Sequence, residues 1–243
     1  MSELRVALVA EGPTDAIIIE AALKVLLPAL SSSRCFSPSP PAPKLGTGWG
    51  GVLRWCLDFA MRGHARMEDD PTLPGFDLFV IHVDADIAED TYADVSEELL
   101  EVARKRGWPV LPSSVPCPPP EGSVDAVRAC LLSWLGVQTL GPKTVLCVPS
   151  KAIDAWLVSA VFDGAHRLLK GLECNVKLEA QLKVLPLAER LRKTTREYRA
   201  REKQITDAWG IVRNRCSQAE RFSNEVVARV THEHVATPNR PDR

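Results

Sequence analysis

The feature that most constrains the fold of this chain is an apolar run that ends abruptly in a carboxylate, and it occurs twice. Residues 4–10 form the first run, and Glu11 follows them directly. Residues 78–83 form the second run, which leads into Asp84 and Asp86. Short continuous apolar runs are typical of strands that are buried on both faces. Carboxylates at the ends of two buried strands repel each other, so bringing them together costs free energy unless a divalent cation neutralises them.

The segments around these runs predict helices that alternate with strands. A third apolar run covers residues 144–149. Apolar residues at helical spacing predict helices over residues 14–27, 51–62, 91–105, 123–135 and 153–161. Thr14 is a candidate N-cap of the first helix, and Asp90 or Thr91 is one for the third. Strands that alternate with helices pair in parallel and place ligands at their carboxyl ends. We therefore predict an α/β fold with a mainly parallel sheet flanked by helices.

The last part of the chain is predicted to be helical, because no strand pattern is evident from residue 178 onward. Residues 187–203 predict a highly charged helix, and residues 207–230 predict one or two helices with an apolar face. A proline-rich loop is expected over residues 37–43. We therefore divide the chain into a catalytic core over residues 1–165, a basic helical subdomain over 166–235 and a disordered tail over 236–243.

The charge of the chain is distributed unevenly. Residues 1–150 hold 12 Lys and Arg against 19 Asp and Glu, whereas residues 151–243 hold 18 against 12. An acidic half joined to a basic half suits a metal-dependent enzyme that acts on a polyanion. The alternative is that both halves are solvated faces that only attract each other. On the first interpretation, the residues that bind nucleic acid are Arg190, Arg192, Lys193, Arg196 and Arg199.

The cysteines and the hydropathy pattern indicate in which cellular compartment the protein is expected. The seven cysteines are odd in number, scattered and without a C-x-x-C pair, which favours reduced thiols over disulfides or a zinc site. No apolar run approaches the roughly 20 residues that cross a bilayer. The N-terminus lacks the basic and apolar regions of a secretion signal. We therefore expect a cytoplasmic protein that has no membrane partner.

The two carboxylate motifs together resemble a known family. The strand that ends in Glu11, with Asp15 four residues later, resembles the first motif of TOPRIM domains, and the Asp-Ala-Asp sequence at Asp84 and Asp86 resembles their D-x-D motif. TOPRIM is the catalytic module of topoisomerases, bacterial primases, small maturation ribonucleases and the overcoming-lysogenization-defect (OLD) nucleases. The resemblance spans residues 4–160 and implies a Rossmann-like TOPRIM fold with a helical C-terminal extension.

Further segments narrow this resemblance. The aspartate at position 15 makes the chain more similar to the OLD branch than to primases. Residues 149–157 and 209–222 resemble segments of small standalone bacterial TOPRIM-like proteins. No G-x-x-x-x-G-K-[ST] motif is present, so the chain lacks the nucleotide-binding motif of full OLD proteins.

The resemblance implies a Mg²⁺ or Mn²⁺ site at the strand ends. Glu11 would serve as a metal ligand or general base, and Asp84 and Asp86, two residues apart on a strand, would reach one cation. The alternative for Glu11 is an ordinary carboxylate at a helix start. Asp15 would complete a second metal position or simply interact with the dipole of its helix.

Two residues after the third strand extend the candidate site. In OLD-type nucleases a lysine or an acidic residue in this region supports the site, so Lys151 would stabilise charge on a transferring phosphate. Asp154 would be a further metal ligand, although it is shorter than the usual glutamate. Both also have a purely structural interpretation. His82 is expected to point away from the acidic face, and the spacing of His232 and His234 is interpreted as incidental.

The preferred hypothesis is a metal-dependent nuclease that hydrolyses phosphodiesters of DNA or RNA. The resemblance implies a role in bacterial anti-phage defence or as a toxin-like effector, with a separately encoded ATPase and a homo-oligomer as expected partners. The first alternative is a non-catalytic TOPRIM-like binding subunit of a larger complex. The second is an enzyme of nucleotide phosphotransfer.

Overall fold

The computed structural model describes residues 3–37 and 46–235, with side chains up to residue 231. Most of the predicted proline-rich loop and the whole predicted tail over 236–243 lie outside these ranges, as do the side chains of His232 and His234. None of the helices in the described part is long and apolar enough to cross a membrane.

The sheet has four parallel strands in the order β2-β1-β3-β4. Their bounds are β1 (Leu4–Val9), β2 (Leu30–Ser37), β3 (Leu78–His82) and β4 (Thr144–Cys147). Val9 pairs with Ile81 at the end of β1, and His82 pairs with Cys147 at the end of β3. Because all pairings are parallel, the carboxyl ends of the strands lie at one edge of the sheet. The predicted α/β class is confirmed.

The edge strand β2 is absent from the prediction, which is a correction. Its sequence, LSSSRCFS, has three consecutive serines and lacks the apolar run that marks a doubly buried strand. It pairs only with β1, and most of its residues are partly or fully exposed. An edge strand with a solvated face needs few apolar side chains, so its pattern is weak.

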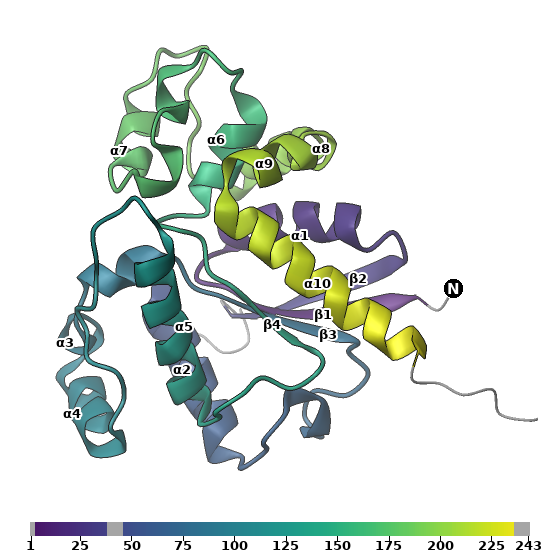
Figure 1. Ribbon diagram of the computed structural model, residues 1–243, viewed down its shortest axis with the longest axis vertical. Coiled ribbons are helices and arrows are strands. Elements are labelled where there is room, and N and C mark those ends of the chain that lie inside the picture. The colour runs from purple at the N-terminus through teal and green to yellow at the C-terminus, as the bar shows by residue number, and fades with distance from the viewer. Residues whose placement is uncertain (1–2, 38–45, 236–243) are drawn as a thin grey trace, which may run out of the picture.

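Helices cover both faces of the sheet (Figure 1). The α-helices are α1 (Pro13–Leu26), α2 (Gly48–Met61), α3 (Tyr92–Val95), α4 (Glu97–Arg106), α5 (Glu121–Leu135), α6 (Asp154–Val161), α7 (Leu178–Lys183), α8 (Thr195–Asp207), α9 (Trp209–Arg215) and α10 (Ser217–Val235). Short 3₁₀ turns are η2 (Met67–Asp69), η3 (Ala85–Glu89), η4 (Arg167–Leu169) and η5 (Leu172–Cys174). Val6 and Leu8 of β1 share a hydrophobic core with α1, α6 and α8–α10, whereas Ala7 and Val9 face α2 and α5.

Two predicted helix starts need correction. Thr14 is not an N-cap, because α1 begins at Pro13 with Gly12 as its cap. The single helix predicted over residues 91–105 is two helices, since Ser96 interrupts it and caps α4 with its side chain. Of the two predicted N-caps, Asp90 and Thr91, the structure has Thr91, which caps α3 in a capping box with Asp94.

The charged helix predicted over residues 187–203 is only partly correct. Helix α8 starts at Thr195, and the side chain of Thr194 accepts a hydrogen bond from Glu197 N as its cap. Residues 184–194 form a loop in which Leu191 is buried. Pro186 lacks an amide hydrogen, and Thr194 offers a favourable helix start, so the helix begins late.

The C-terminal helices belong to the main hydrophobic core. The predicted apolar face of α9 and α10 is buried against β1, α1 and α6. This face consists of Trp209, Val212, Cys216, Ala219, Phe222 and Val226. Helix α8 packs along α1, and α10 packs on β4. The division into a core and a subdomain at residue 165 stays a prediction.

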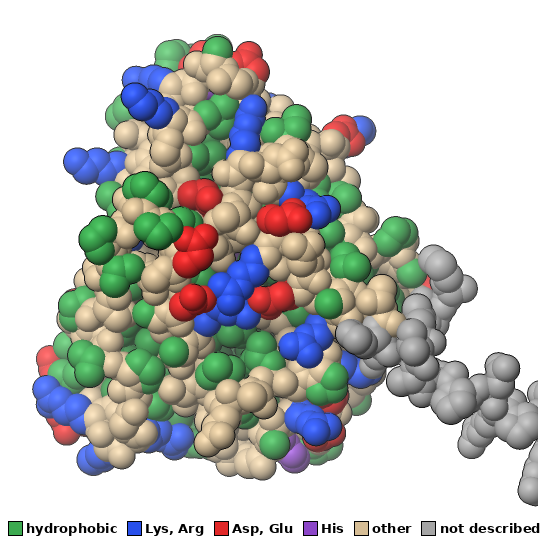
Figure 2. Space-filling view, viewed as in Figure 1, with side chains coloured by type: hydrophobic (Ala, Val, Ile, Leu, Met, Phe, Trp, Pro, Cys, Tyr) green, Lys and Arg blue, Asp and Glu red, His purple; other side chains and the backbone are tan. Residues whose placement is uncertain are grey.

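Ion pairs join α10 to α5 across the face that Figure 2 displays. There, Lys and Arg side chains in the middle of the face have acidic side chains on either side. Arg128 of α5 lies 2.8 Å from Glu225 of α10, and Arg221 of α10 lies 2.8 Å from Asp125 of α5. Arg128 and Arg221 are therefore paired within the protein.

A disulfide corrects the expectation of reduced thiols. Cys117 and Cys174 are bonded, with their Cα atoms 5.5 Å apart. The bond joins the proline-rich segment before α5 to the turn η5. The other five cysteines are free, and four of them are buried.

The packing of α10 predicts a large loss of stability for Phe222→Ala. Phe222 is 1% exposed and contacts Trp156 with ring centroids 5.8 Å apart. Phenylalanine-to-alanine changes in a core cost about 3–5 kcal/mol. Val227→Ala on the same helix is the control, because Val227 is 42% exposed and surface changes cost about 0.5 kcal/mol or less. Urea unfolding measures both. Equal, small losses would contradict the packing of α10 on the sheet.

Candidate functional site

The ends of β1 and β3 bring Glu11 and Asp84 into contact. The backbone N–H of Asp84 donates a hydrogen bond of 2.7 Å to Glu11 Oε1. Asp84 is buried and Glu11 is half-buried. Because neighbouring parallel strands end at the same edge, this contact follows directly from the sheet order. The two carboxylates that mark the strand ends in the sequence therefore lie together.

The segment after β4 closes the third side of the site. The N–H of Ile153 donates to Asp84 Oδ1 at 2.8 Å. The N–H of Asp86 donates to the carbonyl of Lys151 at 3.2 Å. Backbone hydrogen bonds thus hold the D-x-D segment against the loop that follows β4.

Burial and mutual repulsion raise the pKa values of these acids. Loss of water raises the pKa of Glu11 well above its ordinary value, and the charges of Asp84 and Asp86 raise it further. Burial, followed by the charge of Asp154, raises the pKa of Asp84 to about 7. Asp86 is exposed at the rim of the site, but the neighbouring protein displaces part of its hydration water. This loss of water and the charge of Asp84 raise the pKa of Asp86 to about 7. The groups around Glu11, Asp84 and Asp86 therefore do not fully neutralise the negative charge of these three acids.

Asp15 lies beneath this group at the start of α1. Its side chain is buried, and its Oδ1 accepts a hydrogen bond of 3.2 Å from the hydroxyl group of Thr14. Burial raises the pKa of Asp15 to about 6, while His82 and Lys193 lower it and Asp84 raises it. The interaction of Asp15 with Asp84 shows that it belongs to the same electrostatic cluster.

Asp154, the first residue of α6, is held by two groups. The hydroxyl of Tyr198 from α8 donates to its Oδ1. The ammonium of Lys193 lies 3.2 Å from its Oδ2. The side chain is buried, so these contacts stabilise its charge where water cannot.

Lys193 is part of the acidic cluster, which the sequence analysis does not anticipate. Burial lowers the pKa of Lys193, but the negative charges of Asp154, Asp15 and Asp84 outweigh it and raise the pKa above its ordinary value. Tyr198 and Ile205, seven residues apart on α8, are both buried, a spacing that marks the buried face of a helix but does not identify Asp154 as the partner of Tyr198. No spacing pattern connects Lys193 to Asp154.

Lys151 is buried but pairs outside the carboxylate group. Its Nζ lies 2.6 Å from Glu89 Oε1. Within the described residues it forms no ion pair with Glu11, Asp84 or Asp86. Glu89 therefore directs the ammonium to the side of the site.

His82 contacts the acidic face, which corrects the expectation that it points away. Residues two apart on a strand share a face, and His82 Nε2 lies 3.1 Å from Asp84 Oδ1. Burial lowers the pKa of His82 to about 4. Burial therefore favours the neutral ring, which shares a hydrogen bond with Asp84.

The predicted nucleic-acid-binding residues divide into two groups. Arg190, Arg192 and Lys193 lie in the loop before α8. Arg196 and Arg199 lie on α8, where Arg199 is paired with Glu20 at 2.7 Å and with Glu202 at 3.2 Å. They do not form one continuous helix face.

The donor set of the site suits a hard cation. In residues 3–37 and 46–231, no group of three or more His, Cys, Asp or Glu side chains is arranged to hold a metal ion. However, Glu11 Oε2, Asp84 Oδ2 and the Asp86 carboxylate make no hydrogen bond within the described ranges. Carboxylate oxygens are the preferred ligands of Mg²⁺ and Mn²⁺. Glu11 and Asp86 also reach solvent, so their side chains are free to adjust.

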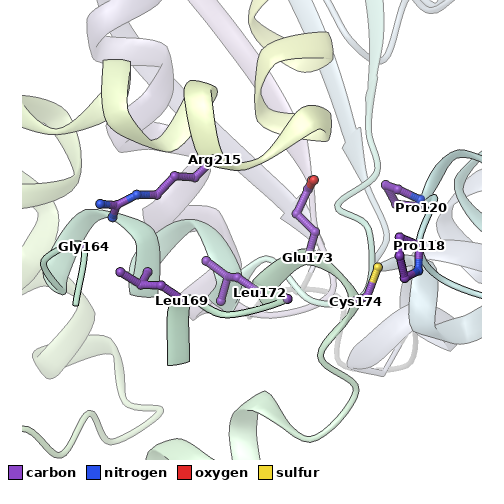
Figure 3. A pocket seen from close by; sticks show the side chains of 9 residues that line it. Pro118, Pro120, Gly164, Leu169, Leu172, Glu173, Cys174 and Arg215 are labelled. Atoms are coloured by element: carbon purple, nitrogen blue, oxygen red, sulfur yellow. The ribbon is translucent and has the colours of Figure 1, made fainter. Parts of the chain in front are cut away.

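A cavity of about 470 Å³ lies beside the site, between the proline-rich segment and η5. Figure 3 shows Gly164 and Arg215 toward one end of it, Pro118 and Pro120 at the other, and Leu172 and Glu173 between them. The carboxylate of Glu173 accepts a hydrogen bond of 2.8 Å from Ser150 Oγ, which ties the wall of this cavity to the loop after β4.

Comparison with known proteins gives no match: no family model, no curated protein and no solved structure matches the chain.

The raised pKa values predict how stability depends on pH in metal-free solution. The folded chain binds protons at Asp84 and Asp15 more tightly than the unfolded chain does. Their stabilising contribution is fully present below the unfolded pKa of about 4 and is lost as the pH rises through about 6 to 7. The amide of Asp84→Asn does not titrate, so the stability of this variant relative to wild type should rise between about pH 4 and about pH 7.

Urea unfolding at several pH values, with a chelator present, measures this difference. Glu98→Gln is the control, because Glu98 is an exposed acid of α4. A difference between Asp84→Asn and wild type that stays constant with pH would show that Asp84 titrates normally.

Proposed function

We propose that this chain is a nuclease that hydrolyses nucleic-acid phosphodiesters with Mg²⁺ or Mn²⁺. The observation that carries the proposal is the contact between Glu11 and the backbone of Asp84 at the carboxyl ends of two parallel strands, with Asp86 near enough for its charge to raise the pKa of Glu11. Within the described residues, Glu11 Oε2, Asp84 Oδ2 and the Asp86 carboxylate make no hydrogen bond. Such a concentration of negative charge is costly unless function requires it. The resemblance of the same residues to TOPRIM motifs supports the proposal independently of their geometry.

The chemistry assigns separate roles to these carboxylates. Asp84, Asp86 and Glu11 would hold the cation, which would neutralise charge on the phosphate and activate water. Glu11 is also a candidate general base, because its raised pKa makes it a better proton acceptor near neutral pH than an ordinary glutamate. Lys193 offsets the negative charge of Asp154 and Asp15, so these two acids add less repulsion to the carboxylates that would hold the cation.

The finer points of the proposal rest on the resemblance alone. They are a role in anti-phage defence or as a toxin-like effector, a separately encoded ATPase and a homo-oligomer. The proposed cytoplasmic location rests instead on the hydropathy pattern and the N-terminal sequence. DNA and RNA both remain candidate substrates.

One observation favours the alternative of a non-catalytic binding subunit. Lys193 already places a positive charge against Asp154, and its attraction extends to Asp15 and Asp84. A lysine can satisfy an acidic cluster in place of a metal ion. The two functions differ in whether the purified chain cleaves nucleic acid.

The first test concerns catalysis. Glu11→Gln keeps the size of the side chain but removes its charge and its ability to accept a proton. Cleavage of single- and double-stranded DNA and RNA should fall by at least about two orders of magnitude, since general-base catalysis contributes that much. Glu98→Gln, an identical change on α4, should cleave like wild type. If Glu11→Gln cleaves as fast as wild type, the enzymatic proposal fails.

The second test concerns the metal itself. Mg²⁺ or Mn²⁺ should raise the melting temperature of the wild type, because a ligand that binds only the folded state stabilises it by mass action. The shift should shrink in Asp84→Ala and in Asp86→Ala. Calorimetric titration with Mn²⁺ gives the affinity directly. An equal response in wild type and both variants would exclude a cation site at these residues.

A further inference from the structure

A second cavity, of about 480 Å³, lies between α7 and the loop over residues 184–194. We call it the basic pocket. Its lining consists of Glu179, Lys183, Arg190, Leu191, Arg192 and Lys193. Four cationic side chains and one acid give it a positive charge. Its volume is within the range of about 300–1,000 Å³ that small-molecule sites occupy.

The cations of the basic pocket are not fully used by the protein. Glu179 pairs with Lys183 at 2.7 Å and with Lys193 at 3.6 Å. Within the described residues, the Arg190 side chain donates from Nε to the carbonyl of Leu185 at 3.2 Å and makes no other hydrogen bond. The side chain of Arg192 is exposed and makes no hydrogen bond or ion pair within the described part of the chain. The pocket therefore holds guanidinium donors that have no acceptor.

The cavity in Figure 3 provides a contrast within the same protein. Its Arg215 donates to the carbonyls of Ser159 and Phe162 at 3.0 and 3.2 Å. Its Glu173 accepts from Ser150 and Ser217. The charged groups of that cavity hold the fold together, whereas those of the basic pocket are available to a ligand.

A phosphate group is the ligand that fits the basic pocket best. Guanidinium groups donate paired, parallel hydrogen bonds to the oxygens of a phosphate. Lys183 and Lys193 are paired with Glu179 and Asp154, so the two arginines provide the excess of positive charge that suits a phosphate monoester or diester. A neutral ligand would leave that charge without compensation.

The basic pocket shares a wall with the carboxylate site. Lys193 lines the pocket, and its Nζ lies 3.2 Å from Asp154 Oδ2. Ile153, the residue before Asp154, donates its N–H to Asp84 Oδ1 at 2.8 Å. The pocket is therefore joined to the carboxylate site through Lys193, Asp154 and Ile153.

We propose that the basic pocket is a subsite for a second phosphate of the substrate, with Arg192 as its main ligand and Arg190 beside it. Its place in catalysis rests on the proposed nuclease function, but phosphate binding itself does not. The phosphate belongs either to the end of a strand, as a monoester, or to the interior of a strand, as a diester.

The test is binding of short labelled single strands to the full chain in EDTA, which prevents cleavage. Two probes of one sequence carry either a terminal phosphate or a terminal hydroxyl. The variants are Arg192→Gln and, as a control with the same loss of charge, Lys203→Gln on α8, whose side chain is 85% exposed. Arg192→Gln should weaken binding about tenfold, as expected for the loss of hydrogen bonds between charged groups. Lys203→Gln should weaken it less than about twofold.

The two probes distinguish the sources of the phosphate. A terminal phosphate in the pocket predicts that Arg192→Gln weakens only the phosphorylated probe. An interior phosphate predicts that it weakens both probes equally. Equal affinities of Arg192→Gln and Lys203→Gln for each probe, or the absence of binding by wild type, would overturn the proposal.

Cleavage is measured separately, with Mn²⁺ in place of EDTA. If Arg192→Gln weakens binding but the wild type does not cleave, the subsite proposal stands and the nuclease proposal fails. If the wild type cleaves but Arg192→Gln binds as tightly as wild type, the nuclease proposal stands and the subsite proposal fails. Melting temperatures of both variants show whether each is folded.

Discussion

Repulsion among acidic side chains at one edge of the sheet is the constraint on which the site depends. The parallel order of β1 and β3 forces Glu11 and Asp84 together, and the fold opposes their repulsion with backbone donors. The N–H groups of Asp84 and Ile153 each donate to a carboxylate oxygen. These bonds favour the charged forms, whereas burial and mutual repulsion disfavour them. The raised pKa values show that repulsion and burial outweigh the backbone donors.

The parts of the site that could be predicted are those encoded by local pattern. Glu11, Asp84 and Asp86 each follow an apolar run directly, and parallel strands must end at the same edge. The parts that could not be predicted depend on contacts distant in sequence. Tyr198 lies 44 residues from Asp154, and no periodicity connects them. Strand β2 was missed because an edge strand needs little apolar surface, which leaves only a weak pattern.

The loop over residues 184–194 lies between two regions of opposite charge. Lys193 contacts Asp154 of the candidate site, and Arg192 is an exposed residue that lines the basic pocket. The prediction of a continuous basic helix was wrong here because Thr194 caps α8 late. A loop can direct successive side chains to different neighbours, whereas a helix would have repeated them every third or fourth residue.

The disulfide between Cys117 and Cys174 makes part of this chain a covalent ring. Its ends are 57 residues apart, and the ring contains α5, β4 and α6, including Lys151 and Asp154. In the chain-entropy view, closing a ring of this size stabilises the folded state by about 4 kcal/mol through the unfolded state. Glu11, Asp84 and Asp86 lie outside the ring. Because this effect acts on the unfolded chain, a reducing compartment would lower the stability of the whole fold, including the strands that carry Glu11 and Asp84, although no atom of the site belongs to the bond.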